Sequence, residues 1–257
     1  MAGLPEEARP GIAGVRQLGI ISGGLMVGGR LGGRSILLLT GTAWLAQPAE
    51  AGAWAIGQGV QQWLASVSHE TGDFGEAWRG DDSIEFGLGD GWTVNAKVET
   101  EIRIGDLYDD RSGFRLGVLK AFALTDRASF AVQASALGGE AMDGPECAGE
   151  GYELRAAVGA SFSLFGREGY VNTEAAHRSR GSCDRQVVEI ATGLEFATDW
   201  NLTLKAWQEQ GSGARSAKAE AGISRDFGMF GVGVGWREEI SGEFEEKGWV
   251  VSAQASF

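Results

Sequence analysis

Residues 92–104 read WTVNAKVETEIRI, and their side chains alternate in polarity along the whole stretch. Every second residue from Trp92 is apolar or threonine, and the residues between them are polar or charged. Successive side chains of a β-strand point to opposite faces, so a period of two predicts a strand. Thirteen alternating residues exceed the five or six of an ordinary strand. The stretch therefore predicts a long strand with one apolar and one polar face.

The same alternation recurs along the chain. In YELRAAVGASF (152–162), Leu154 and Val158 share a face that opposes Glu153 and Arg155. The first stretch is less regular, because Trp63 does not share a face with the apolar residues before it. The pattern predicts twelve strands, at 53–68, 82–88, 92–104, 113–123, 128–138, 152–162, 169–179, 186–196, 200–210, 215–225, 230–236 and 248–257.

The connections between these strands are of two kinds that take turns along the chain. Short ones with turn residues, such as Gly89-Asp90-Gly91, favour tight hairpins. The others are mostly longer and polar, and they are expected at 69–81, 105–112, 139–151, 180–185, 211–214 and 241–247. This alternation is typical of an up-and-down antiparallel sheet with one trimmed and one elaborated rim.

Composition limits the class of protein. The chain has 257 residues, 42 of them glycine, with 43% hydrophobic residues and nine tryptophans, which is not a disordered composition. The formal net charge of −13 argues against a nucleic-acid partner, because no basic stripe is present to neutralise phosphates. No apolar run reaches the roughly 18 residues that a membrane-spanning helix needs.

The N-terminal part has the pattern of a secretory signal peptide. Arg30 and Arg34 precede a compact apolar stretch at 35–46. Ala49 and Ala51 then fit the small-x-small cleavage pattern, with a cut after Ala53 as the alternative. We therefore expect 1–51 to be an upstream extension plus signal peptide, with Met1 or Met26 as the start, and 52–257 to be the exported domain.

Cys147 and Cys183 are the only cysteines. In an exported protein such a pair favours a disulfide over a metal site, and here it would tie two neighbouring long connections together. The two histidines, His69 and His177, add no zinc-like spacing. We expect neither a metal site nor a cofactor.

Two folds are compatible with strands that have one apolar and one polar face. A soluble barrel or sandwich buries the apolar face, whereas a transmembrane barrel turns that face to lipid and encloses the polar one. Aromatic residues favour the second, because they gather at both ends of the apolar face around an aliphatic middle, as expected at membrane interfaces. The fold class predicted is all-β: a single antiparallel up-and-down transmembrane barrel of about 12 strands.

The polar face would then line the lumen. Its charges are too evenly balanced in sign to indicate an ion preference. The predicted lumen-lining residues are Lys97, Glu99, Glu101, Arg103, Arg115, Glu153, Arg155, Glu174, Arg178, Glu189, Glu195, Lys205, Glu209, Lys218, Glu220 and Arg237.

The sequence ends on WVVSAQASF (249–257), a strand with one apolar and one polar face whose last residue is Phe257. With the signal peptide and the alternating strands, this resembles the bacterial outer-membrane β-barrel proteins. That resemblance implies a place in the outer membrane of a Gram-negative bacterium, contact with its lipid, and assembly machinery that reads Phe257. More narrowly, EFGLGDGWTV, ALTDRASFAV and EFATDWNLTL resemble poorly characterised proteobacterial transporter-like barrels, which implies no particular substrate.

One pair of residues raises an enzymatic alternative. His177 and Ser179 form a His-x-Ser pair on an outward face, similar to the pair of outer-membrane phospholipase A and lipid A deacylase. Those families follow the Ser with Asn, where this chain has Arg180. Glu189, on the next strand, points inward by strict alternation, so no orienting partner is evident and we assign no catalytic residue. Our main hypothesis is a porin-like, narrow pore for small solutes; the alternatives are an outer-leaflet lipid-modifying enzyme and a structural or surface barrel without transport.

Overall fold

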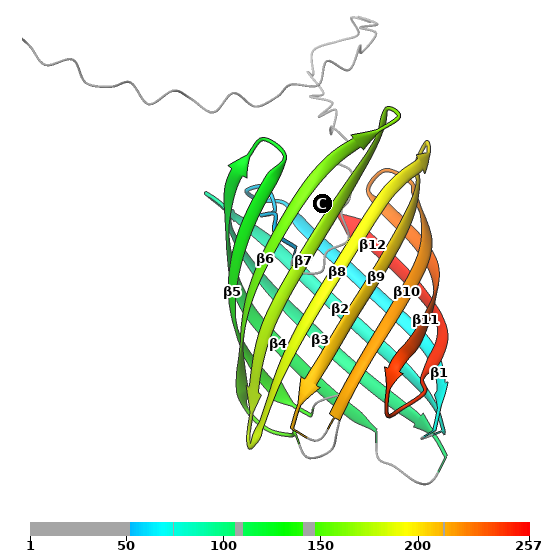
Figure 1. Cartoon of the computed structure of the whole chain (residues 1–257). Coiled ribbons are helices and arrows are strands. Elements are labelled where there is room, and N and C mark those ends of the chain that lie inside the picture. Colours follow the sequence, from blue (N-terminus) through cyan, green and yellow to red (C-terminus); the bar gives the residue numbers. More distant parts are fainter. Residues whose placement is uncertain (1–51, 74, 106–109, 141–146, 213) are drawn as a thin grey trace, which may run out of the picture. The chain divides into compact units, whose positions relative to one another are not determined.

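The computed structural model describes residues 52–73, 75–105, 110–140, 147–212 and 214–257. They form a closed barrel of antiparallel strands in which each strand pairs with its neighbours in sequence and the first pairs with the last (Figure 1). The predicted twelve-stranded up-and-down barrel is confirmed, whereas the predicted signal peptide at 1–51 lies outside the described residues. The strands are β1 (Gln61–Gly72), β2 (Gly75–Gly89), β3 (Trp92–Ile104), β4 (Arg111–Thr125), β5 (Ala128–Gly139), β6 (Gly151–Leu164), β7 (Arg167–Arg180), β8 (Cys183–Ala197), β9 (Trp200–Gly211), β10 (Ala214–Asp226), β11 (Phe230–Gly242) and β12 (Lys247–Ser256).

The barrel closes between its first and last strands. The backbone N–H of Gln61 donates to the carbonyl of Phe257 at 3.1 Å, and the N–H of Phe257 donates to the carbonyl of Gln61 at 2.9 Å. Beyond this pair, β1 and β12 stay in register from Gln62 opposite Ser256 to Thr71 opposite Lys247. Closure leaves no strand edge unpaired, which is what strands need in hydrocarbon.

One end of the barrel carries very short turns, and we call it the turn rim. Its connections are residues 90–91, 126–127, 165–166, 198–199 and 227–229, and the hairpins β6–β7 and β8–β9 lie at the upper end of Figure 1. Asp90 and Gly91 have φ of 50° and 78°. Positive φ at both central residues is the geometry that two-residue hairpins favour. Glycine adopts positive φ without steric cost, which suits Gly91 to the second of these positions.

The opposite end, the loop rim, differs from our expectation. The long connections predicted at 69–81, 180–185 and 211–214 are wrong: β1 meets β2 across 73–74, β7 meets β8 across 181–182, and β9 meets β10 across 212–213. The predicted loop at 241–247 is also shortened, to 243–246. The strands continue beyond these predicted bounds, and most of their residues there are polar, small or charged, which resembles a loop in the sequence. Trp78, on the outer face of β2, is an exception.

The first predicted strand is misplaced. β1 begins at Gln61 rather than at 53, and its outer face carries Trp63 and Val67. Residues 53–60 form no strand, and Ala53 is fully buried. The irregular pattern of 53–68 thus has a physical cause, because apolar residues before Gln61 belong to a segment inside the barrel rather than to its outer face.

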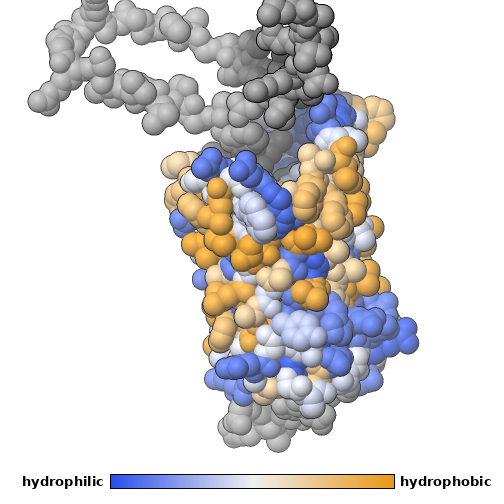
Figure 2. Space-filling view, turned by 90° about the vertical axis from the view of Figure 1, so that its left-hand side faces the viewer, coloured by the Kyte–Doolittle hydropathy of each residue, from blue (hydrophilic) through white to orange (hydrophobic). Residues whose placement is uncertain are grey.

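The two faces of the sheet are the reverse of those in a soluble protein. The largest fully buried side chains of the described residues are Glu101, Glu153 and Thr93. By contrast, Val158 and Ile190 are about half exposed, at 51% and 50%. Figure 2 shows one side of the barrel, where hydrophobic residues gather over the middle and hydrophilic ones toward both ends. The apolar face therefore points outward, and the alternative of a soluble barrel or sandwich is wrong.

Aromatic rings border this apolar surface. At the turn rim the rings of Phe227 and Phe230 stack with centroids 5.5 Å apart. Toward the loop rim, Trp236 and Trp249 meet edge-on at 5.1 Å. Two such belts are expected where a barrel crosses the two membrane interfaces. The described residues contain no helix that is long and apolar enough to span a membrane.

Candidate functional site: the barrel interior

Charged residues meet inside the barrel in two groups, which we name after their central residues. In the Glu153 network, the Glu153 carboxylate accepts hydrogen bonds from Arg115 Nη1 and Arg155 Nε, each at 3.1 Å, and from Arg178. Arg155 also pairs with Glu174. The residues come from β4, β6 and β7, so the ion pair between Arg115 and Glu153 reaches across the intervening strand β5.

The second group, the Arg79 network, lies on the wall formed by β1–β3 and β10–β12. The Arg79 guanidinium contacts Glu70, Glu101 and Glu246 at 3.1, 2.9 and 2.7 Å. The network also holds Arg103, Lys218, Glu220 and Arg237. It contains four acids and four bases, so the charge on this wall is balanced.

The other predicted lumen residues lie on the same inner face in smaller pairs. Lys97 contacts Glu99 at 2.9 Å and also Asp81 at 3.1 Å, and Lys205 contacts Glu189 at 3.4 Å. The remaining two, Glu209 and Glu195, are reached by arginines from other strands, Arg178 and Arg167, each at 3.4 Å.

Several interior charges escaped the sequence analysis. Glu70, Arg79 and Asp81 fell in the supposed loop at 69–81, Arg185 in that at 180–185, and Glu246 in that at 241–247. The alternation of inward and outward side chains along β1 and β2 does continue through Glu70, Arg79 and Asp81. Following it past the last apolar residue would have found Glu70 and Arg79.

A disulfide closes one side of the loop rim. Cys147 and Cys183 are bonded, with Cα atoms 5.4 Å apart, and both are buried. The predicted disulfide is present, but Cys183 is the first residue of β8 rather than part of a loop. The bond holds the end of the β5–β6 connection against the interior.

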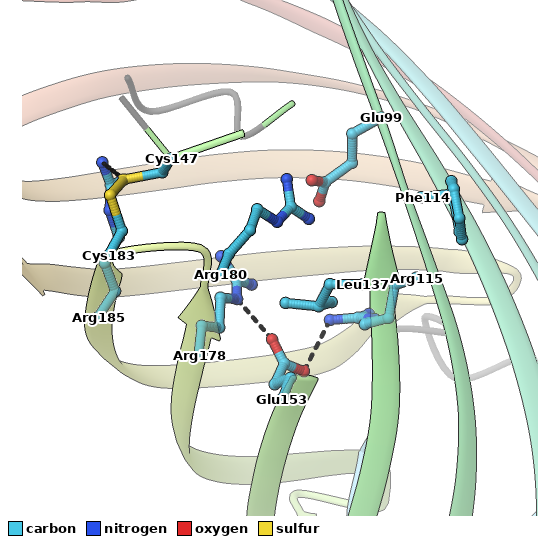
Figure 3. A pocket seen from close by; sticks show the side chains of 10 residues that line it. All are labelled: Glu99, Phe114, Arg115, Leu137, Cys147, Glu153, Arg178, Arg180, Cys183 and Arg185. Carbon is cyan, nitrogen blue, oxygen red and sulfur yellow. Dashed lines mark hydrogen bonds and ion pairs between the residues drawn. A yellow bond between two sulfur atoms is a disulfide. The ribbon is translucent and has the colours of Figure 1, made fainter. Parts of the chain in front are cut away.

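A small cavity lies beside this disulfide (Figure 3). Its volume of about 40 Å³ has room for a few water molecules, since one needs about 10–15 Å³. Figure 3 shows Arg178 and Arg115 directed at Glu153, and the guanidinium of Arg180 pointing toward Glu99. We call the half of the interior nearest the loop rim the loop half, and the other the turn half. In the loop half, paired charges surround the cavity.

The turn half of the interior is occupied differently. Residues 52–60, which we call the inner segment, run inside the barrel before β1 begins. The N–H of Ala53 donates to Asn172 Oδ1 on β7 at 3.2 Å, and the N–H of Ile56 donates to Thr93 Oγ1 on β3 at 3.3 Å. The N–H of Gly59 donates to the carbonyl of Gly87 on β2 at 2.9 Å, so the inner segment covers the wall from β7 to β2.

Glycines take up inward positions on β10 and β11. Gly222 on β10 and Gly231, Gly233 and Gly235 on β11 occupy inward positions. A Cβ at Gly222 would meet only backbone atoms, the nearest at 3.3 Å. A Cβ at Gly233 would instead meet Ser252 Oγ at 2.7 Å. We call these four positions the glycine wall, and Gly222 is the one among them where a Cβ has the most room.

On the outer face near the loop rim, His177 and Ser179 have an acidic neighbour that the sequence analysis missed. Asp184 lies opposite Ser179 on β8, and its Oδ1 is 4.0 Å from His177 Nε2. That separation is too long for a hydrogen bond. Glu189 points inward and pairs with Lys205, as expected. No group of three or more His, Cys, Asp or Glu residues in the described ranges could hold a metal ion.

Solved structures with the same fold are outer-membrane barrels. The chain is similar to the COG4313 outer membrane channel from Pseudomonas putida F1, with a TM-score of 0.59 and 12% identity over 82% of this chain and 100% of that one. The NanC porin has a TM-score of 0.56 and 8% identity, covering 75% of this chain and 98% of its own. The KdgM porin has a TM-score of 0.52 and 13% identity, covering 76% and 99%. No known protein family and no curated protein matches the chain.

The fold and the lipid-facing surface together define the class of protein. A closed barrel with an apolar exterior, aromatic belts and an ionised interior is built to cross a membrane with strands. The architecture is that of the similar solved structures, an outer membrane channel and two porins. The chain therefore has the fold of a transmembrane β-barrel.

Proposed function

We propose that the barrel is a narrow, porin-like pore that passes small solutes across the outer membrane. The observation that carries this proposal is the interior itself: networks of ionised side chains line it, and glycines take up inward positions on β10 and β11. Twelve strands lie between the filled eight-stranded barrels and the wide porins of 16–18 strands. The similar structures, an outer membrane channel and two porins, support the same function.

Conductance in planar lipid bilayers tests the proposal. The purified, folded barrel is expected to give small, discrete current steps, with weak preference for cations or anions because the charged networks are balanced. Its control is the same preparation unfolded before addition. A folded barrel that never conducts, under any voltage or salt, would leave only a structural or anchoring role.

The glycine wall gives a specific prediction. Gly222→Trp places an indole at an inward position where a Cβ meets only backbone atoms, and it is expected to lower single-channel conductance severalfold. Gly222→Ala adds only a methyl group and should lower conductance far less. Equal conductance in Gly222→Trp and the parent protein would mean that solutes do not pass along this wall.

Assembly belongs to the same proposal. We propose that 1–51 is removed on export and that the barrel assembly machinery recognises Phe257. We also propose that the apolar outer face contacts the lipid of the outer membrane of a Gram-negative bacterium. Phe257 is 68% exposed at the turn rim, where a binding partner could reach it. The resemblance to transporter-like barrels implies no particular solute.

A lipid-modifying enzyme is the second candidate, and Asp184 is the observation that favours it. His177, Ser179 and Asp184 lie together on the outer face, where an acyl chain of the outer leaflet could approach. Against it stands the 4.0 Å gap between His177 and Asp184. We expect the lipid profile of cells overproducing the protein to be the same with His177→Ala and with Ser179→Ala. Loss of a deacylated or lysolipid product in both variants would favour the enzyme instead.

A further inference from the structure

The inner segment is seated in a socket of its own. Inside a lumen lined by charged groups, Leu119, Ala131 and Ala157 form a buried apolar cluster together with Ala53 of the inner segment. Trp54 packs against the same cluster. Apolar residues on the inner wall of an aqueous pore are unfavourable when exposed, so this part of the wall is suited to a covering segment.

Glycine makes room for the segment at two inward positions. A Cβ at Gly159 on β6 would lie 2.4 Å from the Trp54 ring, and one at Gly87 on β2 would lie 2.1 Å from the carbonyl oxygen of Gly57. Any side chain at these positions would collide with the inner segment. Trp54 also meets the ring of Tyr170 on β7 edge-on, with centroids 6.2 Å apart, a favourable aromatic geometry.

The segment is held far more weakly than a strand. In the described part of the chain, two hydrogen bonds join residues 53–58 to the strands, and both end on side chains, those of Asn172 and Thr93. Among the same described residues, the only backbone bonds of the segment to a strand are at its far end, where Gly59 and Val60 bond to Gly87 of β2. By comparison, β1 and β12 are joined by a full antiparallel ladder. Few backbone hydrogen bonds mark a region that opens locally while the rest stays folded. Trp54 has the largest side chain of the segment and packs against the apolar cluster, Gly159 and Tyr170.

We propose that the inner segment is a displaceable gate of the turn rim, latched by Trp54 in the socket around Gly159. In the closed state it covers the wall from β7 to β2 and leaves the glycine wall as the remaining passage. When Trp54 leaves the socket, the segment swings out about Gly59 and Val60, which hydrogen-bond to Gly87, and the mouth widens. The gate rests on the proposed pore function, but its movement can be measured separately.

Two variants release the latch by different means. Trp54→Ala removes the indole, and Gly159→Ala puts a methyl group where the indole lies. Both are expected to raise single-channel conductance severalfold, with Trp54→Phe intermediate. Matched controls act on the outer face: Trp236→Ala removes an outer aromatic, and Gly169→Ala adds a methyl group 2.6 Å from the Phe162 ring. Both controls should conduct like the parent.

A second measurement follows the segment without requiring conduction. Ala53 is fully buried and the native cysteines are bonded, so Ala53→Cys gives one thiol that a maleimide should not reach in the folded barrel. Adding Trp54→Ala or Gly159→Ala is expected to make it react at least severalfold faster.

The outcomes separate the gate from the pore. Faster labelling together with higher conductance supports the gate. Faster labelling with unchanged conductance overturns the gate and leaves the pore intact. Unchanged labelling in both latch variants overturns Trp54 as the latch. If labelling speeds up and neither the parent nor the variants conduct, the pore function fails and the gate fails with it.

Discussion

Glu153→Gln is expected to destabilise the folded barrel by about 3–5 kcal/mol, because it leaves buried guanidinium groups without their compensating charge. Glu153 has no exposed surface and binds Arg115, Arg155 and Arg178. The amide keeps the shape of the carboxylate, so the loss reports charge rather than packing. Urea titration measures it, with the fraction folded read from the gel mobility of unboiled samples.

Glu195→Gln is the matched control. It breaks an ion pair with Arg167, whose side chain is 42% exposed at the turn rim. Exposed pairs contribute little, about 0–1 kcal/mol, so the urea midpoint should hardly move. Equal midpoints for the two variants would show that water reaches Glu153 freely and that the Glu153 network does not hold β4, β6 and β7 together.

The sequence predicted the barrel because lipid and lumen impose opposite demands on alternate residues. That rule predicted the strand at 92–104, and it placed Glu153 and Arg155 on the face of their strand opposite to that of Leu154. The rule failed at the strand ends that extend beyond the lipid, where the two faces no longer have to differ in polarity. Beyond the apolar band both faces meet water, so β1 and β2 could not be followed to their meeting point at 73–74.

The interior was harder to predict than the fold. Alternation shows that Arg115 points inward, but it cannot show that the residue reaches Glu153 past an intervening strand, since that depends on strand tilt and stagger. The inner segment was missed for another reason. Ala53, Trp54 and Ile56 are apolar enough to read as a strand, and only the closed barrel shows that an apolar socket inside the lumen accepts them.

Val158→Lys is expected to lower the stability of the barrel in phospholipid vesicles by about 2–4 kcal/mol, the cost of a lysine on the lipid face near the bilayer midplane. Val158 is 51% exposed and lies between Phe130 of β5 and Thr173 of β7. The long side chain can bend toward an interface, which keeps the cost below that of full burial.

The same substitution distinguishes lipid from water outside the barrel. On a soluble protein, lysine at a half-exposed valine changes stability by no more than about 0.5 kcal/mol, whereas in hydrocarbon its charge loses its hydration. Val158→Leu, which stays apolar, should match the parent in urea titrations of the vesicle-bound barrel. If Val158→Lys also matched the parent, the outer face would have to be hydrated. The ionised interior would then be an unusual core, not a lumen, and both the pore and its gate would have no membrane to cross.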